Sequence, residues 1–298
     1  MRGLIHGCMA AAAFALVAPA WAQDKPEDDA EETEILVQGV RAKERDKQIT
    51  DFIGALTKAP IGGQIARFEE KACPTALGLT PSQNRIVAAR MRTVAKAAGV
   101  PLGDERCAPN VFVVVAQDKA AVLKDLRSRY TDALGDRAPV LNKASPASTW
   151  FMEGLLDSNG IPVGVKEDTG DGASGYYTVE MGDGSSRLRS PSRPHFLAAV
   201  MVVEPAAIAG LTTTQLADHA AMRLFARTDP DRVAKTSAPT ILTVLDAPEG
   251  SEVPITMTQW DFSFLKALYT SGEGRYATAQ RGEMKKIVKK ELNKARAD

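Results

Sequence analysis

Two histidines and a neighbouring carboxylate are the side chains best suited to chemistry in this 298-residue chain. His219 follows Asp218 in a segment with helical periodicity, and His195 stands at the start of the apolar run before it. Imidazole and carboxylate groups can ligate a metal or transfer protons. We therefore take His195, Asp218 and His219 as a candidate groove. Because no metal-binding, phosphate-binding or nucleophile motif accompanies them, we assign no catalytic residue, metal or cofactor.

The first 22 residues have the pattern of a signal peptide. A basic start at Arg2 precedes an apolar run from Cys8 to Pro19, which is too short to span a bilayer, and Ala20-Trp21-Ala22 is typical of a cleavage site. We expect cleavage near Ala22, a periplasmic protein and no transmembrane span in the mature chain.

The mature chain retains two cysteines, Cys73 and Cys107. An even pair in an exported protein predicts one disulfide, and two separate buried thiols are the alternative. Both cysteines lie near the starts of apolar runs that we expect to be neighbouring parallel strands. The predicted bridge would therefore lie at one edge of the sheet.

Composition argues against a nucleic-acid partner. Lys and Arg number 37, Asp and Glu number 37, and aromatic residues make up only 6% of the chain. A balanced charge gives no basic patch for phosphates, and few rings are available for base stacking.

The chain divides into an acidic leader and one folded domain. Residues 23–48 form a predicted disordered acidic linker, within which residues 34–41 are a β-prone run, and residues 49–298 form a single domain. Alternating apolar runs and helical patterns predict an α+β fold, a mixed sheet with flanking helices. Helices are expected at 80–99, 119–130, 212–227, 258–269 and 282–294, and strands at 72–77, 110–116, 150–156, 176–181 and 196–204.

Residues 150–193 are less regular, and we expect them to form a long hairpin that serves as an antiparallel edge or as a lid. A polar loop rich in glycine, 164–175, separates its two strands. Arg187, Arg189 and Arg193 follow in a serine-rich run, which is either a solvated loop or an anion site.

The segment Glu34-Ile35-Leu36-Val37-Gln38-Gly39-Val40-Arg41 resembles the TonB box of outer-membrane receptors. In those receptors the segment adds as a strand to the periplasmic energy transducer, a mode in which backbone hydrogen bonds supply the affinity. The resemblance implies that Ile35, Leu36, Val37, Gln38 and Gly39 bind a TonB-like partner in the cell envelope. An edge strand of the domain itself is the alternative, and no receptor barrel follows the segment.

The order of elements from Arg67 to Tyr269 is similar to that of zincin-like metallopeptidases and of an exported, alphaproteobacterial-type family related to them. The resemblance rests on Arg67-Phe68 before a strand, on the Asn110-led strand, and on the closing helix from Met257 to Tyr269. A zincin carries a His-Glu-x-x-His pattern, whereas this chain reads His219-Ala220-Ala221-Met222-Arg223. The resemblance therefore implies a zincin-like domain without its metal site.

These observations favour a non-catalytic periplasmic interaction or binding protein. Two alternatives stay open. One is an exported hydrolase whose site lies between the helix that carries Asp218 and His219 and the 176–181 hairpin. The other is a protein that binds a small ligand under the 164–175 loop.

Overall fold

The computed structural model describes two compact units, Met1–Lys43 and Glu44–Asp298. The described residues are 28–57, 63–129, 145–163, 166–168, 176–178, 190–228, 230–233, 236–248 and 250–297. The signal peptide, the 164–175 loop apart from residues 166–168, Arg187 and Arg189 lie outside them. In the part that is described, no helix combines the length and apolarity needed to cross a bilayer.

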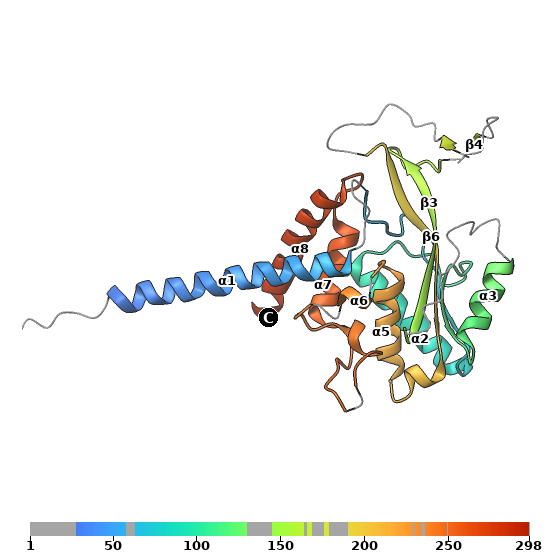
Figure 1. Cartoon of the computed structure of the whole chain (residues 1–298), viewed down its shortest axis with the longest axis horizontal. Coiled ribbons are helices and arrows are strands. Elements are labelled where there is room, and N and C mark those ends of the chain that lie inside the picture. Colours follow the sequence, from blue (N-terminus) through green and yellow to red (C-terminus); the bar gives the residue numbers. More distant parts are fainter. Residues whose placement is uncertain are drawn as a thin grey trace, which may run out of the picture. The chain divides into compact units, whose positions relative to one another are not determined.

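A four-stranded mixed sheet organises the second unit (Figure 1). Its order is β1 (Pro74–Leu77), β2 (Val111–Val115), β6 (Ser192–Val203) and β3 (Ala147–Asp157). The first three strands are parallel, and β3 pairs antiparallel with β6 at the edge. This arrangement confirms the predicted α+β fold with a mixed sheet.

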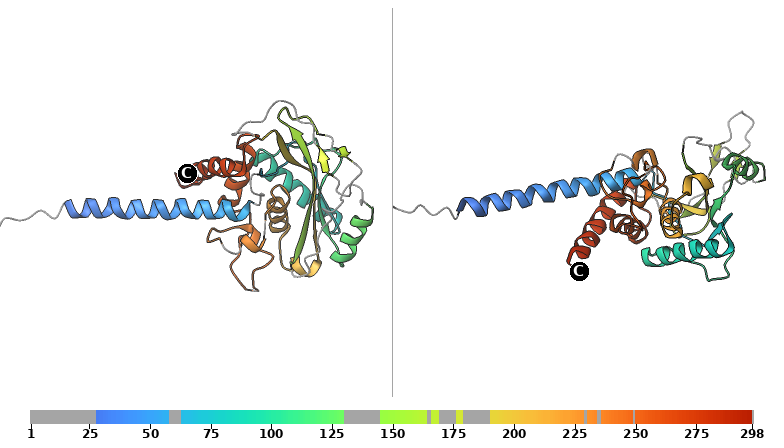
Figure 2. Two further views of the ribbon diagram at one scale, coloured as in Figure 1. Left: turned by 45° about the horizontal axis from the view of Figure 1, so that its top comes forward. Right: turned by 90° about the horizontal axis from the view of Figure 1, so that it is seen from below.

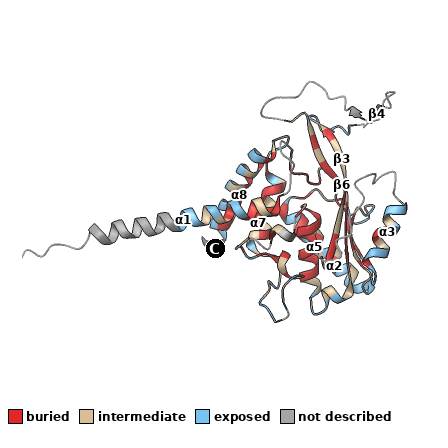
Figure 3. Cartoon of the chain, viewed as in Figure 1, coloured by how far each residue is buried: buried red, intermediate tan, exposed pale blue. Residues whose placement is uncertain are grey.

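Most of the core lies on one face of the sheet, under α2 (Pro81–Ala98), α5 (Thr213–Leu224) and α7 (Gln259–Thr270) (Figures 2 and 3). Alternate side chains of the strands point to this face, because successive residues of a strand face opposite sides. Val111, Val113, Met201 and Val203 are buried there, together with Ile49, Phe52, Phe68, Phe225 and Phe264. Helix α8 (Ala277–Ala297) adds Met284, Val288 and Leu292 to the same core.

Helix α3 (Lys119–Arg129) covers the opposite face. It forms a smaller cluster in which Leu123 packs with Val200 and Val202. Phe112 and Val114 are only partly buried against it. The short helix α3 therefore leaves this face of β2 less covered than the face that points to the main core.

Local sequence signals set the helix boundaries as predicted. A capping box begins each of three helices, at Thr80, Thr212 and Thr258. In each box the threonine hydroxyl accepts from the backbone N–H of the residue three positions later, and the side chain of that residue accepts from the threonine backbone N–H. Gly99 ends α2 in the left-handed conformation, with φ 83°. The buried Asp261 carboxylate of the third box also accepts from Thr240 Oγ1 at 2.5 Å and from the Ile241 amide at 2.8 Å, which fixes the preceding loop.

Two predicted segments differ from the structure. Helix α1 runs from Asp28 to Leu56, so the 34–41 run is helical and not extended. The strand β5 (Tyr176–Thr178) pairs with β4 (Lys166–Asp168) and not with β3, whose partner is β6. The hairpin expected over 150–193 is therefore wrong in its pairing, although its first strand is an antiparallel edge.

The predicted disulfide between Cys73 and Cys107 is present, with the two Cα atoms 6.0 Å apart. Cys73 immediately precedes β1, and Cys107 precedes β2, as expected for neighbouring parallel strands. Gly103 faces the bridge, and a Cβ atom there would lie 2.6 Å from that of Cys107. Glycine at position 103 therefore leaves room for the disulfide.

Candidate functional site

The strongest candidate site is a hollow of about 260 Å³ between α5 and the start of β3. His219 and Arg223 line it from one face of the helix, since residues four apart lie one turn above each other. Ser145, Ala147, Leu242 and Asp246 line the rest.

Arg223 ties the site helix to the edge strand. The residue is 6% exposed, and its Nη2 donates to Thr149 Oγ1 of β3 at 2.9 Å. Guanidinium stays protonated in proteins and has no lone pair to offer a metal. The position four residues after His219 therefore supplies a cation and a hydrogen-bond donor.

His219 is neutral in the folded protein. Its ring is 3% exposed and Nδ1 lies 3.4 Å from the Ile241 carbonyl oxygen. Burial, together with the charge of Arg223, lowers the pKa of His219 to about 3, against the smaller opposing effect of the Ile241 carbonyl. The next residue, Ala220, is fully buried and has no group that could serve as a general base.

Asp218 belongs to a different environment from that of His219. Its carboxylate is fully buried and forms a two-point ion pair with Arg90 of α2, at 2.7 and 3.0 Å. The same carboxylate accepts from Thr256 Oγ1 and from the Met257 amide, both at 2.7 Å. These partners make Asp218 a structural link between α5, α2 and the 256–257 loop.

His195 lies near the start of β6, where its register partner in β3 is Gly154. A Cβ atom at Gly154 would lie 2.6 Å from His195 Nε2, so glycine allows the ring to pack against the strand. His195 is 1% exposed, and burial lowers its pKa. Among the described residues Nδ1 has no hydrogen-bond partner. The structure thus gives His195, Asp218 and His219 three separate environments.

Among the described residues, the outer edge of β3 lacks a neighbouring strand along part of its length. The turn at 158–163 returns to cover Leu155–Asp157. Between Ala147 and Gly154, no strand of the described part of the chain pairs with that edge. An open edge of this kind offers backbone donors and acceptors to another extended segment.

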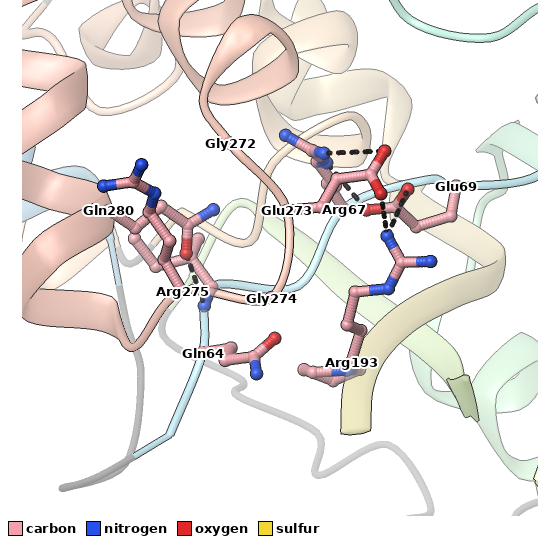
Figure 4. A pocket seen from close by; sticks show the side chains of 11 residues that line it. Gln64, Arg67, Glu69, Arg193, Gly272, Glu273, Gly274, Arg275 and Gln280 are labelled. Atoms are coloured by element: carbon pink, nitrogen blue, oxygen red, sulfur yellow. Dashed lines mark hydrogen bonds and ion pairs between the residues drawn. The ribbon is translucent and has the colours of Figure 1, made fainter. Parts of the chain in front are cut away.

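A second hollow, of about 250 Å³, lies near the start of β6 and the loop between α7 and α8 (Figure 4). Arg67, Glu69, Arg193 and Glu273 line it, and their charged ends point toward one another. Arg193 is 8% exposed within β6, so it does not belong to a solvated loop. The partners of Arg193 lie 80 or more residues away in the sequence. The serine-rich run alone therefore could not decide between a solvated loop and an anion site.

The described residues contain no group of three or more histidine, cysteine, aspartate or glutamate side chains that could hold a metal ion. Comparisons of the chain with protein-family models, with curated proteins and with solved structures found no match.

Proposed function

We propose that this chain is an exported, non-catalytic interaction protein whose body is a zincin-like domain without the catalytic apparatus. The observation that carries the proposal is the Arg223–Thr149 hydrogen bond, at the position where a second metal-binding histidine would stand. A permanent cation four residues from His219 disfavours a divalent metal there. In the His-Glu-x-x-His pattern the glutamate that acts as general base follows the first histidine, and this position is Ala220 here.

The surroundings of this site suit the binding of a protein segment. Helix α5 and the unpaired part of the β3 edge lie on the two sides of this site. The hydrogen bond from Arg223 to Thr149 connects the helix to the strand. A partner segment added to β3 would gain backbone hydrogen bonds without any rearrangement of the sheet. We therefore propose protein binding in place of peptide cleavage.

The segment Ile35–Gly39 is the proposed docking element for a TonB-like transducer in the periplasm. It lies within α1, so docking as a strand requires this part of the helix to unwind. Glycine and β-branched residues have low helix propensity, and Ile35, Val37, Gly39 and Val40 are of these types. Their presence supports an exchange from helix to strand at modest cost.

Restoring the metal pattern tests the loss of catalysis. In the double variant Ala220→Glu/Arg223→His, two imidazoles would again face one another across a helical turn. We expect its zinc affinity, measured by competition with a chelating dye, to exceed that of the unchanged protein by about tenfold or more, which is 1.4 kcal/mol.

Arg223→Gln is the matched control, because it removes the charge and the Thr149 partner without adding a ligand. Zinc binding by the unchanged protein as tight as by the double variant, together with zinc-dependent peptide cleavage, would contradict the proposal.

A further inference from the structure

We propose that Arg67 and Arg193 form a binding site for a carboxylate-bearing ligand, and that Glu273 occupies this site from within the chain. Arg67 is 6% exposed and Arg193 is 8% exposed. Two guanidinium groups buried so close together need negative charge beside them. The carboxylates that supply it differ sharply, because the Glu69 side chain is 17% exposed and that of Glu273 is 60% exposed.

Arg67 is held by the fold itself. Its Nη1 donates to the carbonyl oxygens of Leu268 at 2.6 Å and Ser271 at 3.0 Å, at the end of α7. Its Nε donates to Glu69 at 2.8 Å. Arg67 is therefore in place whether or not Glu273 is present.

Arg193 keeps unused capacity for an anion. Within the described part of the chain its ion-pair partners are Glu273, through a short contact, and Glu69 at 3.9 Å. Its Nε is buried and has no hydrogen-bond partner there. In Figure 4 the Arg193 guanidinium points toward both carboxylates.

Glu273 can leave this position easily. It stands between Gly272 and Gly274 in the loop that joins α7 to α8. Gly274 has φ +69° and no atom within 4 Å of an ideal Cβ, so the backbone there has both freedom and space. The Glu273 side chain is 60% exposed, so water can solvate its carboxylate when it leaves the arginines. A carboxylate from a ligand can then replace it without disturbing the bonds of Arg67 to Glu69, Leu268 and Ser271.

The charges favour a carboxylate over a phosphate. A planar carboxylate matches the planar donor geometry of a guanidinium group, and Glu273 already places one oxygen on Arg193 and the other 3.9 Å from Arg67. Glu69 stays beside the site because it is bound to Arg67 at 2.8 Å, and its charge repels a dianion more strongly than a monoanion.

Chemical rescue tests this site directly. In Glu273→Ala the two arginines lose their exposed partner, and we expect added sodium acetate to raise the melting temperature more than sodium chloride at equal ionic strength. The amide resonance of Gly274 should shift saturably with acetate, and the apparent affinity should exceed that of the unchanged protein about tenfold. Glu283→Ala removes another carboxylate that pairs with an arginine nearby, Arg275, and serves as the matched control.

Two further variants keep the test decisive. Arg193→Lys keeps the positive charge but removes the planar guanidinium group. Combined with Glu273→Ala, it should abolish the stronger stabilisation by acetate than by chloride. Glu273→Gln is used if the alanine variant is too unstable. Equal effects of acetate and chloride, or phosphate binding as tightly as acetate, would overturn the assignment. The site is independent of the docking of residues 35–39, so either proposal can fail alone.

Discussion

Replacing Arg90 by methionine is expected to lower the free energy of unfolding by about 3 to 5 kcal/mol, because it leaves a charged carboxylate buried without its cation. Asp218 is fully buried, and Arg90 meets both of its oxygens. Urea unfolding followed by circular dichroism measures the change. Arg85→Met, on an exposed position of the same helix, is the matched control and should shift stability by less than about 0.5 kcal/mol.

The double variant Arg90→Met/Asp218→Asn separates a structural role from a catalytic one. Removing both charges leaves no buried ion, so its loss of stability should fall short of the sum of the single losses by about 1 to 3 kcal/mol. Additive losses would contradict the ion-pair account. An enzymatic activity that disappears in Asp218→Asn while stability is kept would instead favour the hydrolase alternative.

The second large effect is expected from the disulfide. The variant Cys73→Ser/Cys107→Ser should lose about 4 kcal/mol of stability, because the bridge closes a loop of 34 residues in the unfolded chain. For a folded unit of this size, that loss lowers the melting temperature by roughly 10 °C.

Reduction provides the internal control for this prediction. A reductant should bring the melting temperature of the unchanged protein down to that of the variant and leave the variant unaffected. Two alkylatable thiols in the native, exported protein would show that the bridge is absent from the mature molecule.

Sequence reasoning located the elements whose ends carry local signals. The capping threonines Thr80, Thr212 and Thr258, together with Gly99, determine where helices begin or end, and these signals act within a few residues. The apolar runs gave β1, β2 and β6, and the position of the two cysteines before β1 and β2 matched their pairing.

Two features depend on the folded structure and could not be predicted from local sequence: the conformation of residues 34–41 and the separation of Asp218 from His219. The β-prone run at 34–41 lies within helix α1, which also contains the stretch from Ile49 to Leu56 with its buried apolar side chains. Sequence alone also grouped Asp218 with His219. Adjacent helix residues point about 100° apart, so one meets Arg90 and the other lines the α5 hollow.

The charge cluster around Arg193 could not be found from local sequence. Its charged members lie in three segments: the stretch before β1, the start of β6 and the loop before α8. Only the folded arrangement shows that Arg67 and Arg193 share the carboxylates Glu69 and Glu273.

The central claim, that this is a partner-binding protein, is tested most directly by the affinity of the mature chain for the purified periplasmic domain of a TonB-like transducer. Deletion of residues 34–40 should weaken binding at least about tenfold, whereas deletion of residues 25–31, an equal length of acidic leader, should leave it unchanged.

Ile35→Ala/Val37→Ala/Gly39→Ala should also weaken binding, because alanine favours the helix over the strand. Equal affinity of the intact chain and the 34–40 deletion would contradict docking through this segment.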